Sequence, residues 1–289
     1  QSVTIKFVDV MGGGASGWRT VAIIYAIIGL VVNTISALSV KELPEEELNE
    51  GNEAKNDEKY TLVEAAKLLF SNKYYIMICV TYILQQIYSA MLNMGIYYMM
   101  YVLFNKELYA VFSWAINIPL IIALVITPTL VAKWKGLYKL NLAGYAVGTL
   151  GRALVIVAAY MGSVPLMLAF TALAAFGMGP WQGDMNAVIA NCSEYTYLTK
   201  HKRVDGTMYS CTSLGIKLGG GIGTAITGWL LEFSKFDKSL TVQPGSCINM
   251  LHIMYLWVPF AICVVITFIM SRMNVEKANR ELLQKENCK

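Results

Sequence analysis

Charged residues are scarce in this sequence, and their scarcity narrows the class of protein. Of 289 residues, 15% are charged and 56% are hydrophobic, and the mean hydropathy is +0.51. A typical water-soluble domain carries about 25% charged residues. The composition therefore excludes an ordinary water-soluble core and predicts a protein whose solvent is the lipid bilayer.

Histidine clusters, a disulfide pattern and a basic patch are also missing, and each absence excludes a function. The two histidines, His201 and His252, form no HExxH motif, so we expect no membrane-embedded metalloenzyme, no metal site and no cofactor. Most of the six cysteines lie in apolar runs, so no disulfide framework is expected. The small net charge of +4 predicts no nucleic-acid partner.

The sequence contains apolar runs that are long enough to cross a bilayer as helices. There are seven, at residues 18–39, 75–104, 109–132, 138–160, 164–190, 207–232 and 249–271. We therefore expect an all-α membrane protein with about seven transmembrane helices. The chain begins at Gln1 without a methionine, a basic n-region or a cleavage site, so it is interpreted as a fragment without a signal peptide.

The segments between and after these runs suggest four parts. Residues 1–39 are a loop and one helix, residues 40–74 an acidic linker ending in a membrane-surface helix, residues 75–272 a six-helix bundle, and residues 273–289 a solvated or frayed tail. Basic residues gather in alternate connections: Lys133, Lys135, Lys139, Lys200, Lys202, Arg203, Arg272, Lys277 and Arg280. The positive-inside rule places these connections, the linker and the tail in the cytoplasm.

Lys217 is the only lysine in the run SLGIKLGGGIGTAITGWLLEF, about 15 Å from the helix end at 1.5 Å per residue. A charge at that depth costs at least about 2.5 kcal/mol and normally faces a cavity or a carboxylate. Helical spacing places it on a stripe with Ser210, Ser213, Gly220, Gly221, Thr224 and Gly228, flanked by Thr212 and Ile216. The stripe is expected to face a substrate or an ion. A glycine-rich packing face with a salt-bridged lysine is the alternative.

The preceding run contains helix-weakening residues at Gly177, Gly179, Pro180 and Gly183. We expect an irregular segment there that exposes backbone to a substrate. Trp181 provides a flat apolar face on which a sugar ring can stack, and Asp184 provides a hydrogen-bonding group for hydroxyls. By position alone, a tryptophan of the membrane interface is equally plausible.

Other polar residues allow two interpretations. Glu194, Arg203 and Asp205 lie at the expected cytoplasmic mouth, where exposed loop charges are the simpler interpretation. Arg152 lies deep in its run, and a structural pair inside the bundle is as plausible as a functional role. Uncharged hydrogen-bonding side chains that suit a polyhydroxyl ligand lie in the second run: Gln85, Gln86, Tyr88, Asn93, Tyr97 and Tyr98. Some of these must serve helix packing.

Three segments together resemble one family. They are YYMMYVL at 97–103, ANCSEYTYLTKHKRVDG at 190–206 and IKLGGGIG at 216–223. Their spacing is similar to the Tyr-Tyr pair, the A-D-x-x-[DE]-Y and K-x-x-x-R-x-[ED]-G segments and the Lys-glycine run of the glycoside-pentoside-hexuronide:cation symporters. This family, typified by the melibiose permease, belongs to the major facilitator superfamily. The resemblance covers essentially the whole chain.

The resemblance implies an architecture and a function. The run 18–39 would be the sixth of twelve helices and the remaining runs the seventh to twelfth, so the first five helices would be missing partners. The whole protein would import a sugar or glycoside with Na⁺ or H⁺ across a bacterial inner membrane, by alternating access and without enzymatic chemistry. A non-transporting sensor with the same fold is the alternative. Besides the missing helices, a sugar and membrane lipid are the expected partners.

The resemblance also implies roles for particular residues. Lys217 would belong to the sugar and cation site, and Trp181 lies within one residue of the family's sugar-stacking tryptophan. The neighbours of Lys217 in that site would be Thr212, Ser213 and Ile216. Charges that close the cytoplasmic side would be Glu194, Arg203 and Asp205. Asn191 stands where the family has an aspartate, which removes one charge from this gate.

Overall fold

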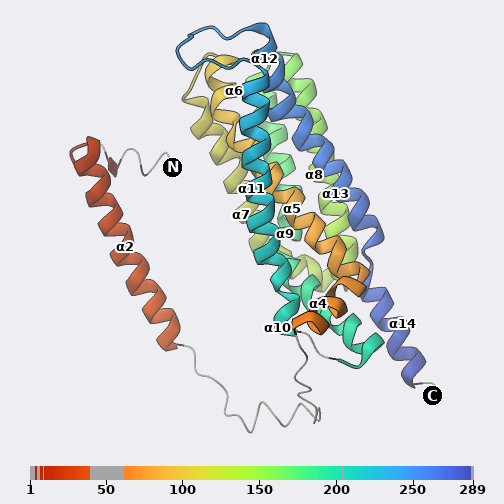
Figure 1. Ribbon diagram of the computed structural model, residues 1–289. Coiled ribbons are helices and arrows are strands. Elements are labelled where there is room, and N and C mark those ends of the chain that lie inside the picture. Colours follow the sequence, from red (N-terminus) through yellow and green to blue (C-terminus); the bar gives the residue numbers. More distant parts are fainter. Residues whose placement is uncertain (1–3, 5–6, 9, 40–61, 203–204, 288–289) are drawn as a thin grey trace. The chain divides into compact units, whose positions relative to one another are not determined.

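A computed structural model describes residues 4, 7–8, 10–39, 62–202 and 205–287, and every regular element in these ranges is a helix (Figure 1). The chain divides into two compact units, Gln1–Tyr60 and Thr61–Lys289. In the described ranges, seven helices are long and apolar enough to cross a membrane, as the apolar runs predicted. The chain is therefore a multi-pass membrane protein.

The first unit contains one long helix, α2 (Gly14–Ser39). Val21 is buried in this unit, but most of the large apolar side chains of α2 are exposed, including Ile27, Leu30 and Leu38. A helix with apolar side chains on all faces requires lipid or other membrane helices around it. The linker residues 40–61 lie outside the described ranges.

The second unit contains the remaining helices. Its first half comprises α4 (Leu62–Ser71), α5 (Lys73–Asn93), α6 (Gly95–Tyr101), α7 (Leu108–Trp134) and α8 (Leu137–Tyr160). Its second half comprises α9 (Val164–Lys200), α10 (Asp205–Met208), α11 (Ser210–Phe233), α12 (Gly245–His252), the π-helix η1 (Ile253–Trp257), α13 (Val258–Arg272) and α14 (Val275–Asn287). Helix α4 confirms the short helix predicted after the linker; its place on the membrane surface and the four-part division stay predictions.

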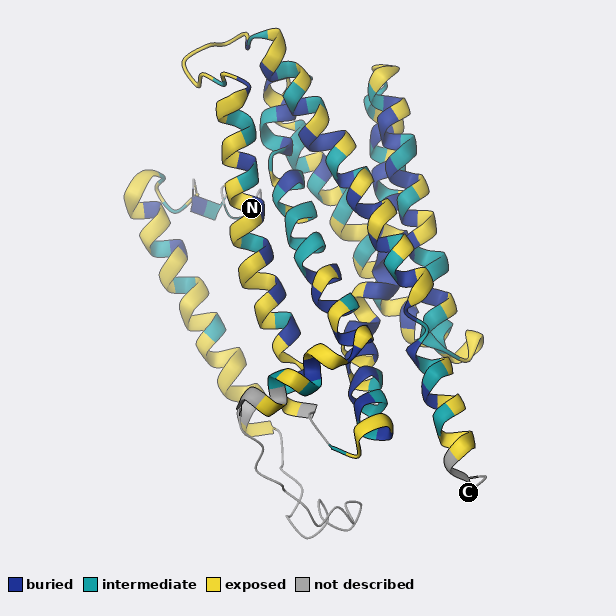
Figure 2. Ribbon diagram, turned by 45° about the vertical axis from the view of Figure 1, so that its right-hand side comes forward, coloured by how far each residue is buried: buried dark blue, intermediate teal, exposed yellow. Residues whose placement is uncertain are grey.

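The long helices of the second unit pack side by side in a bundle (Figure 1). Helix α9 packs along both α7 and α8, α11 packs along α5, and α13 packs along α8 and α5. Exposed apolar side chains cover the outer faces (Figure 2), among them Val125, Trp229 and Phe268. In a bilayer such faces contact lipid, so lipid is the natural partner of this surface.

Helix α9 is continuous, so the prediction of an irregular segment around Pro180 was wrong. The helix runs without a break from Val164–Lys200, with Pro180 inside it. Its glycines serve close packing instead. A Cβ on Gly177 would lie 2.5 Å from the backbone nitrogen of Gly148 and 2.6 Å from the carbonyl oxygen of Gly144. Only glycine therefore permits α8 and α9 to approach this closely.

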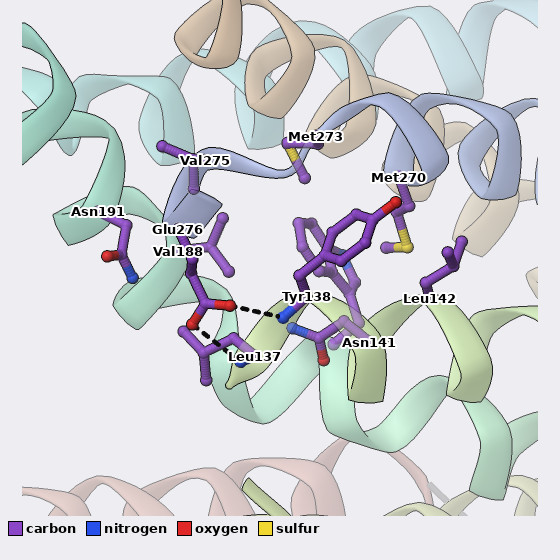
Figure 3. A pocket seen from close by; sticks show the side chains of 11 residues that line it. Leu137, Tyr138, Asn141, Leu142, Val188, Asn191, Met270, Met273, Val275 and Glu276 are labelled. Carbon is purple, nitrogen blue, oxygen red and sulfur yellow. Dashed lines mark hydrogen bonds between the residues drawn. The ribbon is translucent and has the colours of Figure 1, made fainter. Parts of the chain in front are cut away.

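The C-terminal segment is a docked helix, whereas the sequence suggested a solvated or frayed one. The Glu276 carboxylate of α14 accepts hydrogen bonds from the backbone amides of Leu137 at 2.9 Å and Tyr138 at 3.1 Å (Figure 3). The first amides of a helix have no acceptor within the helix itself, so Glu276 caps the start of α8. The Asn279 amide also donates to the carbonyl oxygen of Asn191 in α9, at 2.9 Å.

Candidate functional site

Helix α11 has one packing face and one open face, and Lys217 lies on the open face. The packing face against α5 carries glycines that repeat every four residues, Gly215, Gly219 and Gly223. The open face carries glycines at which an added Cβ would meet no atom of the described chain within 4 Å, Gly220, Gly221 and Gly228. Lys217 is exposed. The stripe predicted from helical spacing is thus separate from the glycines that hold α11 in the bundle.

An open groove of about 480 Å³ lies between α4, α5 and α11 beside this lysine. Ser213 and Lys217 both line it, together with Tyr75 of α5. The Tyr75 hydroxyl oxygen lies 3.1 Å from that of Ser210. In the described part of the chain no ion pair joins Lys217 to a carboxylate. The groove therefore places an unpaired ammonium next to hydroxyl groups.

Two predicted neighbours of Lys217 lie outside the groove lining. Thr212 is half-buried, and its hydroxyl donates to the carbonyl oxygen of Tyr209 at 2.8 Å. Ile216 is 49% exposed and does not line the groove. Of the residues predicted on this helix, the structure brings together Ser210, Ser213 and Lys217 in one groove. Sugar contact by Thr212 and Ile216 stays a prediction.

Trp181 and Asp184 lie inside the bundle instead of at the groove. Trp181 is 1% exposed and Asp184 is 8% exposed. Trp181 and Asn141 line a small pocket of about 20 Å³ between α8, α9, α13 and the start of α14 (Figure 3). Among the described residues, Nε1 of Trp181, Oδ2 of Asp184 and both amide atoms of Asn141 have no hydrogen-bond partner. A volume of this size suits about one water molecule.

The structure therefore does not bring Trp181 and Asp184 together with Lys217. In this conformation a sugar cannot reach the ring of Trp181, because neighbouring side chains cover it. The placement also differs from that of an interfacial tryptophan, which would be partly exposed. Substrate contact by Trp181 and Asp184 stays a prediction that this geometry does not support.

Gln182, the residue after Trp181, lines a larger polar cavity. This central cavity has a volume of about 310 Å³ and lies between α5, α8 and α9. Its polar lining consists of Tyr82, Gln85, Gln86, Tyr88, Ser89, Tyr145 and Gln182. Uncharged hydroxyl and amide groups are suited to the hydroxyls of a sugar. Gln85, Gln86 and Tyr88 were predicted for such a ligand, and they line this cavity.

Some residues that line this cavity were not predicted from the sequence, and some residues that were predicted for a sugar lie elsewhere. Met178, Gln182 and Met185 all line the cavity. Their spacing places them on one face of a helix, so the sequence could have predicted that they lie together on α9. Tyr98, by contrast, packs in an aromatic core. Its ring stacks on that of Tyr255 with centroids 4.7 Å apart. Tyr98 therefore serves helix packing, one of the two roles left open for this set.

Arg152 lies behind the central cavity and pairs with a tyrosine. Its side chain is 2% exposed. Its Nε donates to the Tyr88 hydroxyl oxygen at 2.8 Å, and its guanidinium carbon lies 5.1 Å from the centre of the Tyr88 ring. Nη1 has no hydrogen-bond partner among the described residues. For Arg152, one of the two interpretations was a structural pair inside the bundle. That pair exists, and its partner is the Tyr88 phenol instead of a carboxylate.

The predicted cytoplasmic gate is only partly described. Glu194 is half-buried on α9. Arg203 lies outside the described residues, and Asp205 begins α10. The Asn191 amide donates to the carbonyl oxygen of Ala187 at 3.0 Å. Asn191 is therefore tied to its own helix and to α14, and the gate stays a prediction.

The family of the chain follows from its sequence match. The family described as "MFS/sugar transport protein" matches residues 3–277. The chain belongs to this family. Together with the seven spanning helices, this match confirms the predicted resemblance to sugar symporters and the major facilitator-type all-helical fold.

Two curated bacterial relatives in this family of transporters match at low identity. An "Isoprimeverose transporter" of Lactiplantibacillus pentosus is 25% identical over 264 residues, which are 90% of this chain and 53% of that protein. A "Putative glycoside/cation symporter YagG" of Escherichia coli (strain K12) is 25% identical over 96 residues, which are 33% of this chain and 21% of that protein. The chain thus spans about half the length of the first relative.

Proposed function

We propose that this chain forms the C-terminal six-helix bundle, with one helix of the N-terminal bundle, of a transporter that couples sugar or glycoside import to Na⁺ or H⁺. The observation that carries this proposal is the position of Lys217 on the open face of α11. Alternating access requires two bundles that move about a shared site near the middle of the membrane. The open face of α11 is suited to that shared site.

The charge of Lys217 requires a polar or acidic partner within the membrane. Lys217 lies eleven residues after Gly206, where this span begins, which is about 16 Å at 1.5 Å per residue. An ammonium exposed to lipid at such depth costs about 2.5–3.5 kcal/mol. No ion pair within the described residues offsets that cost. The natural partners are a polar substrate and acidic groups of the other bundle, which would include the missing helices.

The substrate class is inferred from the central cavity and from the relatives. The hydroxyl and amide groups that line the central cavity are uncharged, which favours a neutral polyhydroxyl ligand over a bare ion. The relatives are named for isoprimeverose transport and for glycoside/cation symport. We infer that this protein carries a sugar or glycoside and resides in a bacterial inner membrane.

The coupling cation requires ligands beyond those of this chain. In the described ranges no three histidine, cysteine, aspartate or glutamate side chains are grouped to hold a metal ion. A Na⁺ site needs several oxygen ligands, and a proton needs a titratable acid near the sugar site. We propose that these groups belong to the N-terminal bundle. Glu194, Arg203 and Asp205 would close the cytoplasmic side.

A non-transporting sensor with the same fold is the second candidate, because Asn191 stands where the family has an aspartate. The test uses the whole transporter, meaning this chain with the remaining helices of its gene product, in proteoliposomes. We expect isoprimeverose or another neutral sugar to accumulate when a Na⁺ or H⁺ gradient is imposed, and accumulation to stop when the gradient is collapsed. Sugar binding without uptake under either gradient would favour the sensor.

A further inference from the structure

Two hydrogen-bond donors beside the central cavity, the hydroxyl of half-buried Tyr88 and Nη1 of buried Arg152, lack acceptors among the described residues. The Tyr88 hydroxyl oxygen accepts the Nε–H of Arg152 at 2.8 Å. Because Arg152 is a donor only, the proton of the Tyr88 hydroxyl must be given to another group. No residue in the described part of the chain accepts it. Nη1 of Arg152 is likewise unpaired among these residues.

The groups around Arg152 offer no negative charge. In the described part of the chain no carboxylate forms an ion pair with Arg152; nearby groups include Tyr88 of α5, Tyr145 of α8, Tyr255 of η1 and Cys263 of α13. All four are neutral in their usual state. A buried guanidinium without a carboxylate is costly, and an unpaired buried donor adds a further penalty. Such an arrangement indicates a function when it borders a ligand cavity.

Only one of these two residues reaches the cavity. Tyr88 lines it, together with Gln85 and Gln182, whereas Arg152 lies behind Tyr88. A hydroxyl that accepts a hydrogen bond from a cation is polarised and becomes a stronger donor. The contact between the guanidinium and the Tyr88 ring further fixes the orientation of the phenol.

We propose that Tyr88 is a sugar-binding residue and that Arg152 is its positioning residue. Arg152 holds the Tyr88 hydroxyl so that its proton is donated to an acceptor oxygen of the sugar in the central cavity. That oxygen belongs to a hydroxyl, to the ring or to a carboxylate of the sugar. The proposal rests on the proposed sugar transport and assigns one contact within it.

The experiment measures sugar affinity by calorimetry on the whole transporter in nanodiscs. The probes are isoprimeverose, methyl α-glucoside and glucuronate, and the variants are Tyr88→Phe, Arg152→Lys and the double variant. Tyr88→Phe keeps the ring and removes the donor, so affinity should fall about 5- to 20-fold. Arg152→Lys should weaken binding by a similar or smaller factor. The double variant should bind no more weakly than Tyr88→Phe alone, because both changes remove one contact.

The control is Tyr138→Phe on the same helix as Arg152. It also removes a hydroxyl hydrogen bond, from Tyr138 to the Ser271 carbonyl oxygen at 2.8 Å, but it lies away from the central cavity. Its sugar affinity should equal that of the unsubstituted protein. Melting temperatures of all variants separate lost contacts from lost folding. A purely structural Arg152 would lower the melting temperature and make the two affinity effects additive.

The outcomes distinguish the two proposals. A larger loss with glucuronate than with the neutral sugars identifies the acceptor as a carboxylate, and a uniform loss identifies a hydroxyl or ring oxygen. Unchanged affinity in Tyr88→Phe for every probe would overturn the role of Tyr88. Additive losses in the double variant would overturn the role of Arg152. If the unsubstituted protein binds none of the three probes, the proposed sugar transport fails instead.

Discussion

Helices α9 and α11 both carry closely spaced glycines, but the bundle encloses one and leaves the other open on one side. In the most apolar 18-residue stretch of each span, 50% of the residues of α9 are buried, compared with 22% for the span that contains α11. Helix α9 lies between α7 and α8, and α11 packs mainly along α5. The polar residues follow this difference: Trp181 and Asp184 are buried in α9, whereas Lys217 is exposed on α11.

In both helices some glycines allow close packing, but α11 also has glycines on its open face, where Lys217 is exposed. Gly177 of α9 and Gly219 of α11 each meet the backbone of a neighbouring helix. Lys217 instead is exposed within its own unit and lines the open groove beside α4 and α5. A motif of glycines with a lysine therefore contains two separate features, a stripe that packs against α5 and an exposed stripe that carries Lys217.

The largest effect is expected for truncation of the enclosed tryptophan. Trp181→Ala removes one of the largest fully buried side chains and should destabilise the chain by about 3–5 kcal/mol. Trp181→Phe should be much milder, because the Nε1 of Trp181 has no hydrogen-bond partner among the described residues. Thermal unfolding in detergent measures both. A Trp181→Ala variant that melts normally but binds sugar weakly would show that the ring contacts substrate after all.

A smaller effect is expected for the two stripes of α11. A Cβ on Gly219 would lie 2.8 Å from the Ile83 carbonyl oxygen, so Gly219→Ala should destabilise by about 1–3 kcal/mol. Gly220 is the matched control, because a Cβ there meets no atom of the described chain within 4 Å. Gly220→Ala should be neutral or stabilise by up to about 1 kcal/mol. Equal melting temperatures for both variants would remove the distinction between the stripes.

The smallest effect concerns the docked tail. Glu276→Gln weakens two charge-assisted bonds to the start of α8 and should reduce stability by roughly 1 kcal/mol. Hydrogen exchange at the amides of Leu137 and Tyr138 should accelerate. The control is Glu281→Gln, since Glu281 forms an exposed pair with Lys277 at 3.7 Å, worth about 0.3–0.5 kcal/mol. Unchanged exchange in Glu276→Gln would mean that α14 is not held by this cap.

The number of spanning helices could be predicted from the sequence because bilayer thickness fixes the length of an apolar run. The stripe of Lys217 was predictable for a similar reason, since helical spacing fixes which residues share a face. Both predictions depend only on local geometry. The expected break at Pro180 was wrong because tight packing against α8 sustains α9 through the proline.

The sequence could not predict which of Trp181 and Gln182 points into the cavity. Adjacent residues point about 100° apart in a helix of 3.6 residues per turn, so the choice depends on how the helix is rotated in the bundle. An offset of one residue from the family pattern therefore exchanges a cavity position for a core position. The contact between Tyr88 and Arg152 joins residues 64 positions apart. No spacing rule reports such a contact, because it depends on how α5 and α8 pack.

The central claim is that the open face of α11 is the sugar and cation interface of a transporter. The most direct measurement is gradient-driven sugar accumulation by Lys217→Ala in the whole transporter, with the exposed loop substitution Lys238→Ala as its control. We expect Lys217→Ala to lose accumulation at equal membrane expression, Lys217→Arg not to restore it because a planar guanidinium differs from a compact ammonium, and Lys238→Ala to retain it. Accumulation by Lys217→Ala at the level of the unsubstituted protein would contradict the account.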